Sequence, residues 1–380
     1  RQGLLAIAWF EYGFMAAHKS TDNHLRKMKP EWLSKDIKGN TIAPNGFVWM
    51  NPLHPEPRRF LFDLVLEAID NYDLDGVQLD DRIVWPHITM GYDDYTRAVY
   101  ANEHMGQNPP DDHHDPEWTR WRADKVNEYA RQFATEVRAK RPGILISLSP
   151  AVYPWVYENY CLEWPKWAEW KFGQEAPRPP GVPDSLHPLH SWDEFIPQVY
   201  RMSYDAYEKT WLDQIKWMNQ LGGGRVRDML PGIRVVGDGP DATWDDVRKS
   251  IELARTTNAG GHVLWFSRGI LDLYEQQLTD FYNVKDQGHA PHPKFPADWR
   301  PLPTKLSPTP ASPNTQTRIW HADAPPGDYV VSATQRGLRR VLHTVSVPPG
   351  EKTPVQVALP KDCEDAELLR DRRSDFKRPR

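Results

Sequence analysis

The chain has 380 residues, with 47 basic and 52 acidic side chains and a formal net charge of −5. This length allows one large domain of α/β-barrel size and a smaller one. The charge balance, with no basic run suited to a phosphate backbone, argues against nucleic acid as a partner. The longest apolar stretches fall far short of the roughly 20 residues that a membrane span needs, so no span is expected.

Short apolar runs alternate with helical patterns over residues 1–286. The predicted strands cover residues 4–10, 76–80, 144–149, 195–200, 228–233 and 261–266. The helical patterns between them cover residues 57–72, 118–140, 207–221 and 243–258. Strict alternation of strand and helix predicts parallel β/α units with the helices outside. Because the strands end in Trp, Tyr, Asp and Ser, and no Gly-rich phosphate loop follows them, we expect a TIM-type (β/α)8 barrel rather than an open doubly wound sheet.

The number of predicted strands is smaller than the barrel requires. Six strands are found, whereas a closed barrel of this type has eight. Since the chain opens at the edge of a strand, we expect two further β/α units upstream of Arg1, or a partner that supplies them. The barrel domain is therefore expected to lack its first two units in this chain.

The character of the sequence changes after residue 286. Residues 287–314 are Pro-rich and lack periodicity, which predicts a linker. Residues 315–360 alternate apolar and polar side chains between Pro and Gly turns, which predicts a small antiparallel, β-sandwich-like domain. Residues 361–380 are strongly charged and are expected to be a disordered tail.

Two adjacent aspartates, Asp80 and Asp81, end one of the predicted strands. Side chains alternate faces along a strand, so the apolar Val77 and Leu79 should pack beneath the helices. Gln78 and Asp80 then point into the barrel, with Asp80 at its mouth. Asp81 has the outward parity, and at the strand end it either bends over the mouth or accepts hydrogen bonds from loop amides.

Other strands should place polar side chains in the same interior. The same alternation turns Ser147, Ser149, Gln198 and Tyr200 inward. Glu11, just after the first strand, adds a further candidate acid. A polar interior beside strand-end carboxyl groups predicts an active site at this end of the barrel.

Aromatic side chains gather where the predicted strands end. The best candidates for stacking on a sugar ring are Trp9, Trp85, Trp155 and Tyr200, and Trp265 belongs to the same set of strand-end aromatic residues. The loop 107–118 holds His113 and His114 with three acids, but a Pro-flanked charge run is typical of a solvated loop. No metal and no other cofactor is therefore predicted.

Four segments carry a family resemblance: NYDLDGVQLDDRIVWP (71–86), AWFEYG (8–13), ISLSPAVYPWVY (146–157) and PQVYR (197–201). Together they resemble the glycosyl-hydrolase-like 10 family, which is distinct from the xylanases that share the numeral. The resemblance implies a (β/α)8 glycosidase-type fold and action on bacterial cell-envelope glycans, including peptidoglycan strands. It also implies a site at Asp80 and Asp81, with Gln198 and Tyr200 lining the cleft. We accordingly expect an extracytoplasmic protein, either periplasmic or secreted.

Glycoside hydrolysis uses two carboxyl groups that flank the scissile bond, one protonated and one ionised. Asp80 is predicted to be the ionised nucleophile or base, and Asp81 or Glu11 the proton donor. The predicted substrate-binding residues are Trp9, Gln78, Trp85, Trp155, Gln198, Tyr200 and Trp265. The sequence thus predicts a glycosidase of either stereochemistry with a polysaccharide substrate. Two alternatives stay open at this point, a non-catalytic glycan-binding barrel and an α-glucan hydrolase of the amylase type.

Overall fold

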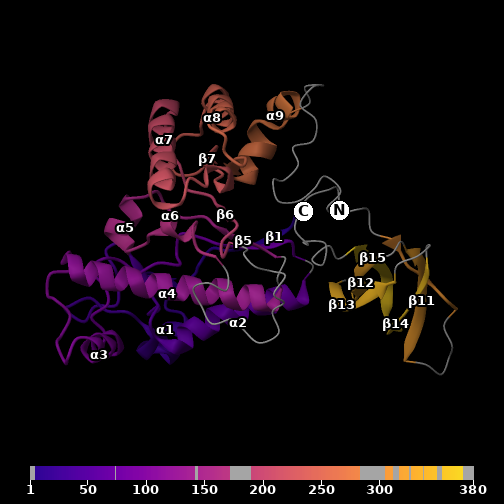
Figure 1. Cartoon of the computed structure of the whole chain (residues 1–380), viewed down its shortest axis with the longest axis horizontal. Coiled ribbons are helices and arrows are strands. Elements are labelled where there is room, and N and C mark those ends of the chain that lie inside the picture. Colours follow the sequence, from indigo (N-terminus) through magenta and orange to yellow (C-terminus); the bar gives the residue numbers. More distant parts are fainter. Residues whose placement is uncertain are drawn as a thin grey trace.

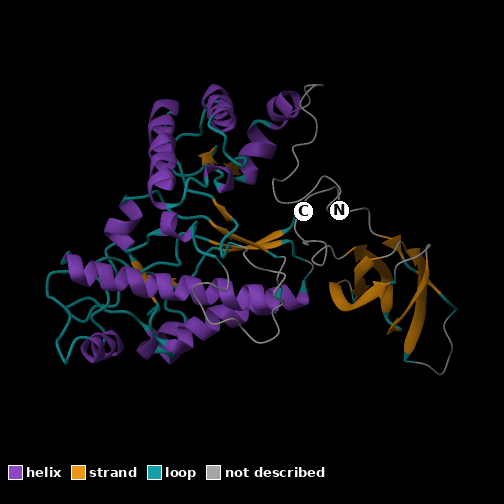
Figure 2. Cartoon of the chain, in the orientation of Figure 1, coloured by secondary structure: helices purple, strands orange, loops and turns teal. Residues whose placement is uncertain are grey.

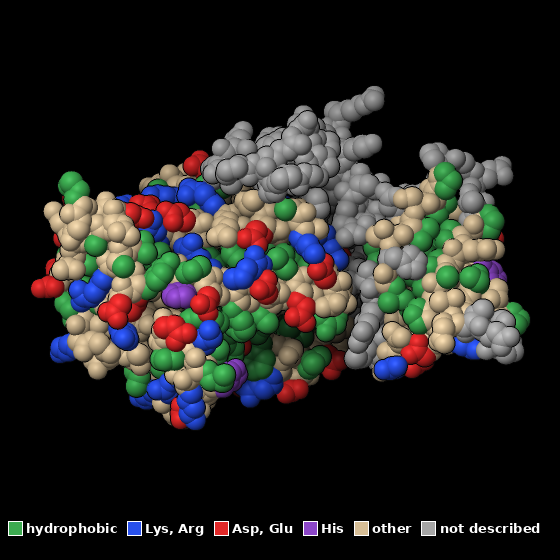
Figure 3. Space-filling view, turned by 90° about the horizontal axis from the view of Figure 1, so that it is seen from below, with side chains coloured by type: hydrophobic (Ala, Val, Ile, Leu, Met, Phe, Trp, Pro, Cys, Tyr) green, Lys and Arg blue, Asp and Glu red, His purple; other side chains and the backbone are tan. Residues whose placement is uncertain are grey.

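The computed structural model describes residues 5–72, 74–141, 144–171, 190–282, 304–310, 316–324, 327–336, 338–348 and 353–370. Among the described residues, parallel strands and helices predominate as far as residue 282, and the strands between residues 304 and 370 form antiparallel sheets (Figure 1, Figure 2). The fold is therefore α/β, as predicted, with a β-rich C-terminal part. Figure 3 shows basic and acidic side chains interspersed over one face of the molecule.

In the part of the chain that the structure describes, six parallel strands follow one another in chain order. The first sheet contains β1 (Ile7–Phe10), β4 (Gly76–Leu79), β5 (Leu145–Leu148) and β6 (Glu194–Phe195) in that order. A second parallel pair contains β7 (Gly232–Arg234) and β8 (Val263–Trp265). Two isolated parallel bridges, Phe195 with Met229 and Gln198 with Gly232, connect the two sheets. Each strand overlaps its predicted range, so the predicted β/α alternation is confirmed for these six strands.

Helices connect the parallel strands. The long helices are α2 (Pro55–Asn71), α4 (Pro116–Lys140), α7 (Tyr204–Leu221) and α8 (Trp244–Thr256). The shorter ones are α1 (His24–Met28), α3 (Asp94–Glu103), α5 (Trp155–Tyr160), α6 (Trp164–Trp167) and α9 (Glu275–Tyr282). Within the described ranges, no helix is both long and apolar enough to cross a membrane.

Several helices begin where a side chain caps them. Asp115 accepts a hydrogen bond from the backbone N–H of Trp118 at 2.9 Å and so starts α4. Thr243 does the same for α8 through the backbone N–H of Asp246 at 3.2 Å. Single turns of other helix types cover Pro30–Trp32, Val226–Asp228 and Gly269–Leu273.

The core of the α/β part lies between the parallel strands and the helices. Val77 and Leu79 of β4 are buried, as their alternation predicted, and share a core with Phe62 of α2 and Phe133 of α4. Each such side chain stabilises the fold by about 1.5–3 kcal/mol. An antiparallel pair that the sequence did not predict, β2 (Met15–His18) and β3 (Phe47–Trp49), lies between β1 and α2 along the chain.

The C-terminal part consists of two antiparallel sheets with a core of their own. Its strands are β9 (Thr304–Lys305), β10 (Ser307–Pro308), β11 (Thr317–Ala324), β12 (Gly327–Gln335), β13 (Leu338–Val347), β14 (Thr353–Pro360) and β15 (Cys363–Arg370). The sheet orders are β10-β11-β14 and β13-β12-β15-β9, and Trp320, Tyr329 and Leu359 lie in the core.

Two predicted boundaries in this part were wrong. Strand β15 lies in the stretch 361–380, which was expected to be a disordered tail, and β9 and β10 lie in the expected linker 287–314. Buried Ala366 and Leu368 hold β15 in its sheet, and the acids around them hid that pattern in the sequence. Residues 371–380 and most of the predicted linker lie outside the described residues.

Candidate active site

Asp80 comes directly after β4 and lies at the carboxyl end of the parallel sheet. Its side chain is only 5% exposed. The amide of Gln198 donates a hydrogen bond from Nε2 to Asp80 Oδ1 at 2.7 Å, and Arg82 donates from Nη1 to Asp80 Oδ2 at 3.0 Å. Both carboxylate oxygens therefore have partners, which a buried carboxyl group requires.

Arg82 brings the three predicted acids together. Besides Asp80, its Nη1 atom lies 3.3 Å from Asp81 Oδ1 and 3.6 Å from Glu11 Oε1. Strand alternation predicted that Asp81 points outward. Because Asp81 lies beyond the strand end, its carboxyl group instead shares Arg82 with that of Asp80. Arg82 itself was not predicted, because it lies in the loop after the strand, where no periodic pattern marks a side chain as inward.

The inward residues of neighbouring strands form a polar network beneath the acids. Gln78 donates from Nε2 to Ser147 Oγ at 2.9 Å, across the β4–β5 ladder. Gln198 donates from the same Nε2 that reaches Asp80 to the backbone carbonyl of Ser149 at 3.1 Å. The structure therefore brings together the side chains that strand alternation had turned to one face.

Burial and mutual repulsion change the acidity of this cluster. Burial, followed by the charge on Asp81, raises the pKa of Asp80 to about 7. Burial is also the main cause that raises the pKa of Asp81. For Tyr200, burial and then the charges on both aspartates raise the pKa. The two carboxyl groups interact, so they titrate as a pair, and the raised pKa of Asp80 favours its protonated form below about pH 7.

Three of the predicted aromatic residues form a continuous row beside the acids. The ring of Tyr200 stacks on that of Trp265, with 5.7 Å between centroids and 26° between planes. The edge of Trp265 meets Trp9 at 5.4 Å and 82°. Gly232 makes room for this row, because a Cβ atom there would lie 3.1 Å from the ring of Tyr200. Trp9 is exposed, so the row reaches the surface.

A second exposed aromatic residue lies at the start of α5. Trp155 is 49% exposed, and its ring lies 5.6 Å from that of Tyr160. The Tyr160 hydroxyl accepts a hydrogen bond from Asn45 at 3.1 Å, and burial, with a smaller contribution from the charge on Asp81, raises the pKa of Tyr160. Tyr160, which the sequence did not single out, therefore contacts Trp155 and interacts with the charge on Asp81.

The prediction for Trp85 was wrong. Its side chain is 0% exposed, its Nε1 donates to the backbone carbonyl of Met90 at 2.9 Å, and its ring contacts Trp118 and Trp121 of α4. The chain after Asp81 turns back into the core instead of following the rim. Trp85 is thus a core residue and no sugar platform.

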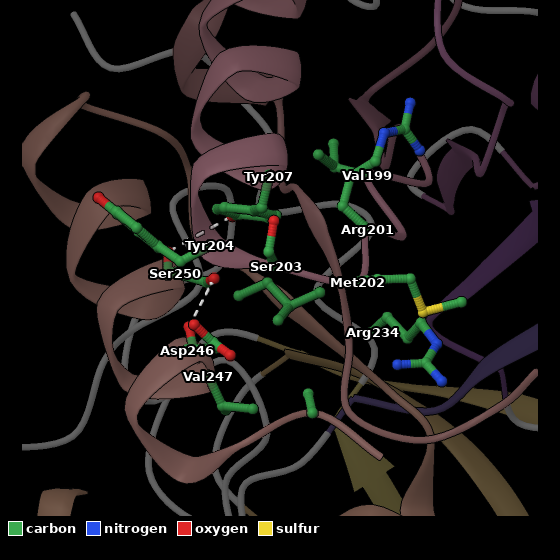
Figure 4. Close-up of a pocket in the computed structure, with 12 residues that line it drawn as sticks. Val199, Arg201, Met202, Ser203, Tyr204, Tyr207, Arg234, Asp246, Val247 and Ser250 are labelled. Carbon is green, nitrogen blue, oxygen red and sulfur yellow. Dashed lines mark hydrogen bonds between the residues drawn. The ribbon is translucent and has the colours of Figure 1, made fainter. Parts of the chain in front are cut away.

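Two other features lie apart from the acids. In the loop 107–118, Asp115 caps α4 and Asp112 accepts from the backbone N–H of His114, and the described residues include no group of three or more potential ligands placed to hold a metal ion. A pocket between α7 and α8 is lined by residues that include Tyr207 and Ser250 (Figure 4). The acids do not line this pocket, and the Tyr207 hydroxyl donates a hydrogen bond across it to the backbone carbonyl of Ser250 at 3.4 Å.

The chain resembles proteins of known families over part of its length. Glycosyl hydrolase YngK of Bacillus subtilis (strain 168) is 27% identical over 148 residues, which are 38% of this chain and 26% of that protein. The S-layer-related protein of Niallia circulans is 28% identical over 187 residues, which are 44% of this chain and 11% of that protein. This chain thus covers about a quarter or less of each of these relatives.

Solved structures with some likeness include two glycoside hydrolases. The glycoside hydrolase domain of PgaB (BpsB) from Bordetella bronchiseptica has a TM-score of 0.48 at 12% identity, over 73% of this chain and 75% of that chain. The α-galactosidase AgaA from Geobacillus stearothermophilus has a TM-score of 0.38 at 11% identity, over 97% of this chain and 45% of that chain. The family model described as Glycosyl hydrolase-like 10 matches residues 1–175, which include Asp80, Asp81 and Glu11, and this match confirms the predicted resemblance to that family.

Proposed function

We propose that the chain is a glycoside hydrolase that cleaves a polysaccharide at the acids around Arg82. The observation that carries this proposal is the convergence of Asp80, Asp81 and Glu11 within 3.6 Å of one guanidinium nitrogen. Glycosidases need one protonated and one ionised carboxyl group at the scissile bond. Below about pH 7 the raised pKa of Asp80 favours the protonated form, and an ionised partner acid supplies the other.

The environments of the two aspartates suggest their roles. Sequence reasoning gave Asp80 the ionised role, but a pKa of about 7 suits the proton donor better. The side chain of Asp81 is 29% exposed, against 5% for Asp80, so water solvates an ionised Asp81 better, although burial raises the pKa of Asp81 as well. In the proposed mechanism Asp80 protonates the leaving oxygen, and Asp81 or Glu11 stabilises or attacks the sugar from its ionised form.

The aromatic row supports a carbohydrate substrate. Trp9 lies in β1, Trp265 is the last residue of β8, and Tyr200 joins them to the acids, so a sugar on the row would lie next to the carboxyl pair. Flat aromatic faces fit the apolar faces of pyranose rings. We propose a cell-envelope glycan of the peptidoglycan type as the substrate, and the name of the S-layer-related protein supports a location outside the cytoplasm.

We further propose that the six parallel strands belong to a (β/α)8 barrel. Two observations support this proposal: the order of these strands in space follows the chain, and the rings of Trp9 and Trp265, from the first and last of them, are in contact. A closed barrel would contain two further strands between β8 and β1. A crystal structure of a longer chain in which β1 and β8 pair with no such strands would contradict this proposal.

The test of the hydrolase activity uses a panel of soluble polysaccharides with glycan strands from de-peptidated peptidoglycan and soluble starch among them. New reducing ends are measured for the wild type, for Asp80→Asn and Asp81→Asn, and for Asp213→Asn as an exposed control on α7. The first two variants should lose at least about 100-fold in rate and keep glycan binding. A wild-type rate in Asp80→Asn would refute the assignment.

A non-catalytic glycan-binding protein remains the second candidate, because the exposed aromatic row alone suffices for binding. It predicts that the wild type binds a polysaccharide of the panel and cleaves none. Cleavage of starch in preference to envelope glycans would instead favour the α-glucan hydrolase.

A further inference from the structure

Arg82 is fixed at its place by the backbone as well as by its side chain. Its carbonyl oxygen accepts a hydrogen bond from the backbone N–H of Phe14 at 3.1 Å. Gly13, whose φ is +48°, permits this approach, because a Cβ atom there would lie 2.4 Å from the Arg82 oxygen. The loop after β1 and the loop after β4 are therefore joined at Arg82.

The side chain of Arg82 completes the connection between these loops. Its Nη1 donates to the backbone carbonyl of Glu11 at 3.3 Å and lies within ion-pair distance of the carboxyl groups of Asp80, Asp81 and Glu11. The Arg82 side chain is only 24% exposed, so solvent screens these interactions less than it screens surface ion pairs.

The surroundings of the acids contain further titratable groups. Tyr200 faces both aspartates from the segment after β6, and Tyr160 faces Asp81 from α5. Neither tyrosine is positively charged at any pH, so neither offsets the repulsion among the three acids. Among the described residues, the cation that pairs with all three is Arg82.

We propose that Arg82 is the positioning residue of this site, which holds the carboxyl groups of two loops around one nitrogen and offsets their mutual repulsion. Without the charge of Arg82, the repulsion among the three acids would turn their side chains out toward solvent or raise their pKa values so that they take up protons. The proposed importance of Arg82 for catalysis rests on the proposed glycosidase function, whereas its effect on the acids does not. The two statements can therefore be tested separately.

The first test needs no substrate. The full chain is labelled with ¹³C at the side-chain carboxyl groups of aspartate, and the carboxyl shifts are followed by NMR across the acidic and neutral pH range. Asp80→Asn and Asp81→Asn identify the two resonances by their loss. In Arg82→Met, both midpoints should rise by about one to two pH units, because an adjacent cation lowers a carboxyl pKa by that order.

Two further variants separate charge from structure. Arg82→Lys keeps the positive charge and should return the midpoints most of the way to those of the wild type. Arg248→Met, on α8, removes an arginine that pairs with Asp245 and Glu252 and should leave the Asp80 and Asp81 midpoints unchanged.

Unchanged midpoints in a folded Arg82→Met protein would overturn the proposal. Should that variant fail to fold, Arg82→Gln keeps hydrogen-bond donors without the charge, and unchanged midpoints there overturn it equally. On a polysaccharide that the wild type cleaves, Arg82→Met should move the pH–rate profile upward by the same amount as the midpoints, and Arg82→Lys should restore it. If the wild type cleaves none, the glycosidase proposal fails, while the carboxyl titration still decides the role of Arg82.

Discussion

Replacing Asp80 by Asn should change how the stability of the protein depends on pH. The pKa of Asp80 is raised from 3.8 to about 7 in the folded state, mainly by burial. The folded protein therefore keeps a proton that the unfolded chain releases at lower pH. Since the unfolded state binds fewer protons in this range, stability falls as the pH rises from about 4 to about 7.

The size of the effect follows from the shift. A difference of about three pKa units corresponds to about 4 kcal/mol, with the pair Asp80 and Asp81 sharing this amount. Asn is an uncharged analogue of the protonated carboxyl group, so Asp80→Asn should resemble the wild type in stability near pH 4. Near pH 8 the variant should be more stable by up to about 4 kcal/mol, or roughly 8 °C in Tm.

Urea unfolding of both proteins at several pH values across this window measures the difference directly. Asp213→Asn on α7, which removes an exposed acid paired with Lys209, is the matched control and should follow the wild type at every pH. A constant difference between Asp80→Asn and the wild type from acidic to alkaline pH would refute the reasoning, because it would mean that Asp80 keeps its ordinary pKa in the folded protein.

Four further outcomes follow from the site and its surroundings. Trp265→Ala should weaken glycan binding about 10-fold, measured by calorimetry in the inactive Asp80→Asn background, because it breaks the aromatic row. Trp85→Phe should lower the free energy of unfolding by about 1–3 kcal/mol in urea titrations and leave glycan affinity unchanged, because Trp85 lies in the core. Arg122→Met should cost about 3 kcal/mol in the same assay, because the buried guanidinium donates to backbone carbonyls of Ile88 and Trp118 that would lose their partner. With Asp80 as the proton donor, the hydrolysis rate should fall about tenfold per pH unit above pH 7, which a pH–rate profile checks.

Strand periodicity predicted the inner half of the site. The side chains of a strand alternate with a period of two, so the burial of Val77 and Leu79 determines that Gln78 and Asp80 share the other face. The hydrogen bond from Gln198 to Asp80 joins two residues 118 positions apart, and each was expected to point inward from its own strand. Such predictions succeed because the hydrogen-bonded ladder of a strand fixes the face to which every side chain points.

The outer half of the site depends on loops, and no period applies there. Arg82 and Trp85 follow the same strand within a few residues, yet Arg82 reaches the acids and Trp85 is buried against α4. The difference arises from contacts with distant segments, namely the turn at Gly13 for one and the helix residues Trp118 and Trp121 for the other. A single sequence contains no signal of these pairings.

Two adjacent aspartates at the end of a buried strand are costly unless their surroundings are built for them. Burial of an unpaired carboxylate costs several kcal/mol, and here Gln198 and Arg82 offset part of that cost. They do not remove it, since the pKa of Asp80 stays at about 7 and asparagine would fit the same place without a charge. Asp80 lowers stability at neutral pH, and Arg82, held in place by a constrained loop turn, binds to it. A residue with such a cost is expected where function rather than folding requires it. Asp80→Asn is predicted to gain stability at alkaline pH and to lose hydrolysis. Both results in one variant would show that Asp80 contributes activity at a cost in stability.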